Sequence, residues 1–115
     1  MKALTIRQPW ASLIMAGIKD VENRTWTTGY RGRLAIHAGA RVEADGLAAH
    51  GHLLPRGDLP RGAMLGTVRL VDVVENYPSV WATPGQWHWV LADPEPLSRP
   101  IPMTGRLGLW TWQVK

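Results

Sequence analysis

The chain has 115 residues and a formal net charge of +4, with 13 Lys or Arg against 9 Asp or Glu, which favours an anionic partner such as nucleic acid. This length suits one domain over residues 1–115, and the absence of cysteine excludes disulfide bonds, thiolate nucleophiles and thiolate metal sites. Because no stretch reaches the apolar length of a membrane span and no signal peptide precedes the patterned sequence, we expect a cytoplasmic protein without membrane attachment.

A first strand is predicted at residues 3–6, followed by a short amphipathic helix. Pro9 suits the first helical position, where its missing N–H group costs nothing. Four residues follow the i, i+3, i+4, i+7 spacing of one buried helical face: Trp10, Leu13, Ile14 and Gly17. Gly17 is expected to end the helix as a left-handed cap. The spacing leaves open whether Trp10 packs in the core or lines a site at the start of the helix.

A short strand is predicted to end at Arg24, with Lys19 in the turn before it. Residues two apart on a strand point to the same face, so Glu22 and Arg24 are expected side by side and within reach of Lys19. Three ionisable groups of alternating sign therefore converge where the helix gives way to the strand. On an exposed face they form a solvated ion pair of little energetic value, whereas on a covered face they form a costly and specific site.

The middle of the chain alternates as a strand and then becomes irregular. Residues 33–38 predict a half-buried strand with two distinct faces, one of Leu34, Ile36 and Ala38 and the other of Arg33, Ala35 and His37. Residues 42–50 predict a weak helix with a glycine inside it. The tetrapeptide Leu-Pro-Arg-Gly then occurs twice within residues 54–62. It predicts either an irregular surface loop with exposed Arg56 and Arg61 or an arm that contacts phosphate.

The rest of the chain is dominated by strands. Residues 63–74 form the longest strand pattern, residues 86–91 predict another strand, and residues 107–114 predict the last one. Residues 93–96 contain two prolines and are predicted to form a turn or connector. The last two strands carry tryptophan pairs on one face, Trp87 with Trp89 and Trp110 with Trp112. These patterns predict an α+β fold, mainly β: a small barrel of five to six mostly antiparallel strands with one or two short helices.

Four residues match the G-x-K-x-x-E-x-R signature of the ASCH domain, a small β-barrel of the PUA-like superfamily: Gly17, Lys19, Glu22 and Arg24. Other segments are similar to the same family in the same order: residues 8–10, 30–32, 36–38, 66–68 and 87–91. The resemblance spans nearly the whole chain, 1–115. It implies a single PUA-like domain with a basic cleft at the motif of residues 17–24 that binds RNA or a nucleotide.

The leading hypothesis is therefore an RNA- or nucleotide-binding module. The residues expected to contact the ligand are Pro9, Trp10, Lys19, Glu22, Arg24, Trp26 and His37. The helix start and the two cations suit phosphate or carboxylate, and either tryptophan suits stacking on a base. Glu22 either accepts hydrogen bonds from a base edge or holds Arg24 in place. His37 is either a contact to a base edge or a satisfied half-buried histidine.

Two other function classes remain open. An enzyme acting on RNA or on modified pyrimidine nucleosides, a ribonuclease or an amidohydrolase, would use Lys19 and Glu22 as acid and base. Family members that hydrolyse acylated cytidine nucleosides carry a threonine at the position of Glu22, and a carboxylate does not replace that hydroxyl nucleophile. A protein-interaction domain would expose a Trp-lined patch far from Lys19. The four histidines lack metal-ligand spacing, so we predict neither a metal nor a cofactor.

Overall fold

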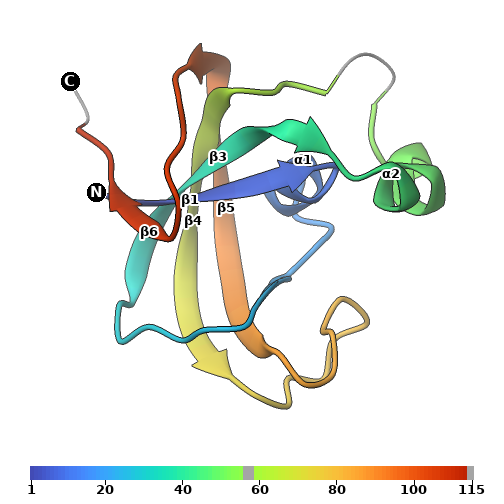
Figure 1. Cartoon of the computed structure of the whole chain (residues 1–115), viewed down its shortest axis with the longest axis vertical. Coiled ribbons are helices and arrows are strands. Elements are labelled where there is room, and N and C mark those ends of the chain that lie inside the picture. The colour runs from blue at the N-terminus through green and yellow to red at the C-terminus, as the bar shows by residue number, and fades with distance from the viewer. Residues whose placement is uncertain (56–58, 114–115) are drawn as a thin grey trace.

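A computed structural model describes residues 1–55 and 59–113, which form a curled six-stranded sheet with two short α-helices (Figure 1). The strands are β1 (Lys2–Gln8), β2 (Val21–Arg24), β3 (Gly32–Val42), β4 (Ala63–Val74), β5 (Trp87–Pro102) and β6 (Leu109–Thr111). The helices are α1 (Trp10–Met15), α2 (Ala44–His50) and a single 3-10 turn, η1 (Gly51–Leu53). The predicted class, α+β and mainly β, is confirmed. No helix in this part of the chain is long and apolar enough to cross a membrane.

The strands are arranged in the order β2-β5-β4-β3-β1-β6. β1 runs parallel to β3, and the other neighbouring strands are antiparallel. The prediction of mostly antiparallel strands is confirmed. The predicted barrel is not supported, because within the described residues no ladder of backbone hydrogen bonds joins β2 at one edge to β6 at the other. β6 is short and pairs only with residues 2–4 of β1. Residues 5–8 of β1 therefore have an edge without a strand partner.

Apolar side chains cover both faces of the central strand β3. The main core packs α1 against one face of the sheet and includes Leu4, Ile6, Ile14, Leu34, Ile36, Val68, Leu70 and Trp89. A smaller cluster on the other face contains Ala3, Ala35 and Met64 beneath Leu97, Met103, Trp110 and Trp112. β3 is thus buried on both faces over residues 34–39, which corrects the predicted half-buried strand. The reason is the C-terminal segment, residues 103–112, whose apolar side chains cover the second face.

The end of α1 places the signature residues. Gly17 adopts a positive φ of 76°, its N–H group donates to Ile14 O at 3.0 Å, and the Ile18 N–H group donates to Leu13 O at 3.0 Å. This pair of hydrogen bonds is the Schellman motif, so the predicted left-handed cap is confirmed. The Lys19 N–H group also donates to Leu13 O, at 3.1 Å. The cap therefore fixes the direction in which the chain leaves the helix and enters β2.

Of four other predicted elements, two agree with the structure and two differ from it. The strand predicted at residues 63–74 has the same bounds as β4, and α2 lies within the predicted residues 42–50. The connector predicted at residues 93–96 is wrong, because β5 continues through it with shifts of register against β4. Prolines are tolerated in a strand where its register shifts. The last strand is shorter than predicted, and Val114 and Arg56 lie outside the described residues.

Candidate functional site

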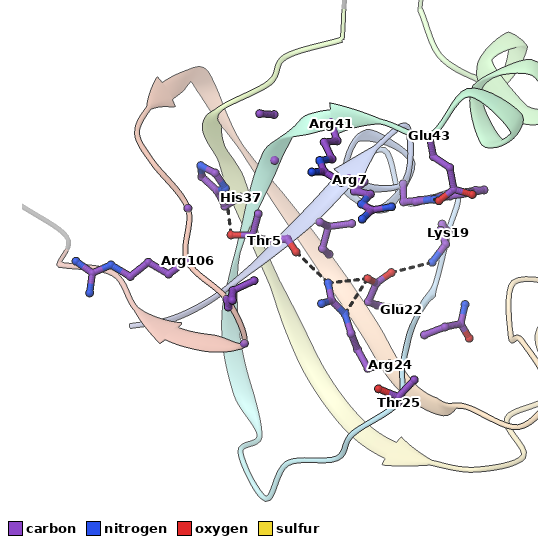
Figure 2. A pocket seen from close by; sticks show the side chains of 18 of the residues that line it. Thr5, Arg7, Lys19, Glu22, Arg24, Thr25, His37, Arg41, Glu43 and Arg106 are labelled. Atoms are coloured by element: carbon purple, nitrogen blue, oxygen red, sulfur yellow. Dashed lines mark hydrogen bonds and ion pairs between the residues drawn. The ribbon is translucent and has the colours of Figure 1, made fainter.

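A cavity of about 1710 Å³ lies beside the unpaired edge of β1, between the loop of residues 75–86 and the C-terminal segment. Six of the seven predicted site residues line it: Trp10, Lys19, Glu22, Arg24, Trp26 and His37. The seventh, Pro9, is buried and lies outside the lining. The structure thus gathers residues from α1, β2, β3 and the segment after β2 around one hollow (Figure 2).

Lys19, Glu22 and Arg24 form a charged cluster in this cavity (Figure 2). Glu22 Oε1 lies 3.3 Å from Lys19 Nζ, and Glu22 Oε2 lies 3.1 Å from Arg24 Nε and 2.9 Å from Arg24 Nη2. The Lys19 ammonium group also donates to the carbonyl oxygen of Val21. Only 4% of the Lys19 side chain and 10% of the Glu22 side chain are exposed. The predicted convergence is confirmed, and the interpretation as a solvated ion pair is wrong because the cluster is largely buried.

The charged cluster carries one net positive charge, because two cations share one carboxylate. Buried charges are costly unless they are paired, and removal of one partner of a buried pair typically costs about 3–5 kcal/mol. Each oxygen of Glu22 faces a different cation, so Glu22 is the counterion that keeps Lys19 and Arg24 together in the cavity wall. The charged cluster therefore contributes net positive charge to the cavity wall.

Arg24 also joins the two edges of the open sheet. Its Nη2 atom donates to the carbonyl oxygen of Thr5 on β1 at 2.9 Å, as well as contacting Glu22. Its Nη1 atom forms no hydrogen bond within residues 1–55 and 59–113. The side chain is 22% exposed and lines the cavity. The guanidinium group is therefore held on one side by the protein and keeps two N–H donors for a ligand.

Three aromatic rings from distant segments form a second group in the cavity wall, the aromatic cluster of Trp10, His50 and Trp81. The ring centroids are 5.7 Å apart for Trp10 and His50, 4.9 Å for His50 and Trp81, and 6.5 Å for Trp10 and Trp81. The indole N–H group of Trp10 donates to Glu43 Oε2 at 3.1 Å. Trp10 also packs against the main core, so its ring belongs to the core and to the cavity wall at once.

The start of α1 is closed by the protein itself. Gln8 Oε1 accepts a hydrogen bond from the Ser12 N–H group at 2.9 Å, and Gln8 Nε2 donates to Ser12 Oγ and to Pro60 O, each at 2.7 Å. Gln8 is fully buried. The Gln8 side chain therefore occupies part of the anion seat expected at the start of the helix, a position that its place in the sequence does not predict.

Two predicted ligand contacts are engaged by protein groups. His37 is 1% exposed; its Nε2 atom donates to the carbonyl oxygen of Met103 at 2.8 Å, and its Nδ1 atom is 3.2 Å from Thr5 Oγ1. His37 is thus the satisfied histidine of the two interpretations. Trp26 packs edge-to-face on Trp89 with ring centroids 4.9 Å apart, at the border between core and cavity.

Sequence reasoning missed several cavity residues. In the described part of the chain, five Lys or Arg and two Glu side chains line the cavity, including Arg7, Arg41 and Arg106, which the motif does not contain. In the view of Figure 2, Arg7 of β1 and Arg41 of β3 lie on the same side of the charged cluster, and Arg106 is directed away from it. The register of β1 against β3 shifts between the pair Ile6–Ala38 and the pair Gln8–Val42. The alternation of side chains along β3 therefore does not predict the face on which Arg41 lies.

Comparisons with known proteins identify the family of the chain. Activating signal cointegrator 1 from Homo sapiens and that from Mus musculus are each 34% identical to the chain over 130 residues, which covers 97% of the chain. The chain spans about a fifth, 22%, of the length of these relatives. The ASCH domain family model matches residues 4–100, which include the charged cluster and most of the sheet. The chain therefore belongs to the ASCH domain family.

Proposed function

We propose that this domain binds RNA, or a nucleotide within it, through a basic cleft formed by the cavity at the motif of residues 17–24. The observation that carries the proposal is Arg24, which Glu22 and Thr5 O hold in place while Nη1 keeps its donors for a ligand. A guanidinium group fixed in this way binds phosphate with little further loss of side-chain entropy. The association of the ASCH family with RNA binding supports the same assignment.

Two further arginines extend this basic cleft. Arg7 and Arg41 are exposed and form no ion pair within the described residues. Exposed guanidinium groups of this kind suit phosphate contacts, which supply most of the affinity of non-specific nucleic-acid binding. The cavity volume, about 1710 Å³, exceeds the roughly 300–1,000 Å³ of pockets that take one small ligand. A single nucleotide would therefore leave much of this open cavity unfilled, which favours an oligonucleotide segment as the ligand.

Fluorescence anisotropy with a labelled RNA oligonucleotide over a series of salt concentrations tests the proposal. Each phosphate contact to a single strand contributes about 0.7 to the slope of log K against log salt. The double variant Arg7→Ala, Arg41→Ala is expected to bind more weakly and to lower that slope by about 1.4. Arg99→Ala is the matched control, because Arg99 is an exposed arginine outside the cavity lining. The proposal would be contradicted if both variants changed the RNA affinity and the salt slope equally. It would also be contradicted if the wild-type protein showed no salt-sensitive binding.

The enzyme alternative stays a prediction. Lys19 Nζ and Glu22 Oε1 lie 3.3 Å apart in the cavity wall, so one substrate in the cavity would be near both groups. Each group would then have to reach the substrate atom that it protonates or deprotonates. Incubation of the purified protein with labelled RNA and with acylated cytidine, with and without a chelator, separates the two functions. Product formation that Lys19→Ala abolishes would favour an enzyme. Salt-sensitive binding without product would favour the binding module.

A further inference from the structure

We infer that Trp81 is a stacking platform for an unpaired base, so that the cleft takes single-stranded nucleic acid in preference to a duplex. The inference rests on the proposed function and specifies its ligand class. Trp81 belongs to the aromatic cluster and lines the same cavity as Arg24, Arg7 and Arg41. Aromatic rings interleaved with cations are the composition of single-strand binding grooves, in which rings hold bases and cations follow the backbone.

The loop of residues 75–86 holds Trp81 rigidly although it has no helix or strand. The Trp81 carbonyl oxygen accepts a hydrogen bond from Asn23 Nδ2 at 2.9 Å, and its N–H group donates to Ser79 Oγ at 3.1 Å. Ser79 Oγ in turn donates to Asp20 Oδ1 at 2.6 Å. Side chains next to the charged cluster in sequence therefore fix the backbone on both sides of the Trp81 ring.

Two cross-strand neighbours complete the support of this loop. Asn23 of β2 and His88 of β5 stand opposite each other in the ladder. Asn23 Oδ1 accepts from the Thr83 N–H group at 2.8 Å, and His88 Nε2 donates to the Thr83 carbonyl oxygen at 2.7 Å. His88 Nδ1 accepts from the Tyr77 N–H group at 3.1 Å, and His88 is 3% exposed. Because His88 is buried and forms hydrogen bonds to two residues of the loop, we expect the loop to have the same conformation before a ligand binds.

The contacts of the three rings single out Trp81 as the ring that receives a ligand. The Trp10 ring is held by Glu43 through its N–H group, lies against Gly46 and has the Lys19 ammonium group 5.8 Å from its centroid. Trp81 contacts Trp10 in an edge-to-face arrangement, with an interplanar angle of 72°. Trp10 and Trp81 both line the cavity, and the Trp81 ring also contacts the His50 ring, with centroids 4.9 Å apart. Within the described residues the indole N–H group of Trp81 donates to no protein group, unlike that of Trp10, so Trp81 is the ring less committed to the protein.

An unpaired base is the ligand that this wall selects. A base inside a duplex is already stacked on both faces and has no face left for an indole ring, whereas an unpaired base can lie on it. Duplexes are held mainly through phosphates, which the arginines of the cleft contact equally in either form. Removal of the Trp81 ring should therefore lower the affinity for single strands and leave the affinity for duplexes nearly unchanged.

The test compares four labelled probes of equal length by fluorescence anisotropy: single-stranded RNA, single-stranded DNA of the same sequence, an RNA duplex, and an abasic single strand. Wild-type protein is expected to bind the abasic strand about 5- to 150-fold more weakly than the strand with bases, since stacking contributes about 1–3 kcal/mol per base. Trp81→Leu should lose the same factor for single strands only, and Trp81→Phe should retain most of the affinity. Trp112→Leu is the matched control, because Trp112 belongs to the cluster on the other face of β3. The two single-stranded probes show whether the sugar also matters.

Each outcome is decisive. Equal binding of the abasic and the normal strand by wild-type protein overturns the inference even if Trp81→Leu fails to fold. If folded Trp81→Leu binds single strands with unchanged affinity, the inference is also overturned. If the double variant Arg7→Ala, Arg41→Ala loses affinity in that case, the proposed function still stands. Absence of salt-sensitive binding to all four probes would instead contradict the proposed function itself.

Discussion

Arg24 on β2 donates from Nη2 to the carbonyl oxygen of Thr5 on β1 at 2.9 Å, so a side chain crosses the open edge of the sheet. A backbone ladder would bring the two strands to about 4.8 Å and fill the space between them. The longer arginine side chain connects them and leaves a cavity. The side chain that bridges the two strands thus also places a cation at the cavity.

The charged cluster predicts that Glu22→Gln is strongly destabilising. The variant keeps the side-chain shape but leaves Lys19 and Arg24 without a counterion in a poorly solvated place. We expect the free energy of unfolding to fall by about 3–5 kcal/mol, measured by urea denaturation. Glu95→Gln is the control, since the Glu95 side chain is 73% exposed in its ion pair and should change stability by less than about 1 kcal/mol. Equal effects would show that burial adds nothing to the Glu22 interaction.

The variant Arg24→Lys keeps the positive charge but removes the forked hydrogen-bond donors of the guanidinium group. An ammonium group cannot contact Glu22 and Thr5 O in the forked arrangement of a guanidinium group. We expect the free energy of unfolding to fall by about 1–2 kcal/mol and RNA affinity to fall as well. Arg69→Lys, in an exposed pair with Asp93, is the control. Unchanged RNA affinity in Arg24→Lys would mean that charge alone matters at this position.

Gly46→Ala tests how α2 accommodates the Trp10 ring. Alanine favours a helix over glycine by about 1 kcal/mol, so helix propensity alone predicts stabilisation. A Cβ atom at Gly46 would lie 2.4 Å from Trp10 Cζ2, however, and would force the ring to move. We expect a net destabilisation of about 1–3 kcal/mol in thermal unfolding. A rise in the melting temperature would show that Trp10 has room to shift.

Thr5→Val tests the attachment of the C-terminal segment. Thr5 Oγ1 accepts from Trp110 Nε1 at 3.1 Å and contacts His37 Nδ1 at 3.2 Å, so valine leaves both groups without this partner. We expect a loss of about 1–3 kcal/mol and faster amide hydrogen exchange in residues 103–112. Thr111→Val, at an exposed position, is the control. If amide hydrogen exchange in residues 103–112 were unchanged, apolar packing alone would hold this segment in place.

Local features of the chain were predictable because local physics specifies them. The strand at residues 63–74 is long and continuous, and its bounds were predicted without error. Gly17 ends α1 as a left-handed cap because the conformation there suits glycine. The spacing of Glu22 and Arg24 places both on one face of a strand wherever that strand lies. These features involve residues within a few positions of each other.

The remaining features depend on contacts between distant segments. β5 continues through its prolines because β4 offers a partner there, with Gly66 close enough that a Cβ atom would lie 2.4 Å from Glu95 O. The closed start of α1 depends on Gln8, which also contacts Pro60. The aromatic cluster joins residues that lie up to 71 positions apart in the chain, Trp10 and Trp81. No periodicity in a single strand or helix reports such proximity.

The sequence by itself determined the family, the mainly β class and the convergence of a lysine, a glutamate and an arginine, because backbone periodicity and capping act over a few residues. Only the tertiary structure decided that the sheet stays open, that the three charges are buried together, and which arginines and tryptophans share their cavity. The physical reason is that burial and side-chain proximity depend on the path of the whole chain, which a repeat of two or 3.6 residues does not encode.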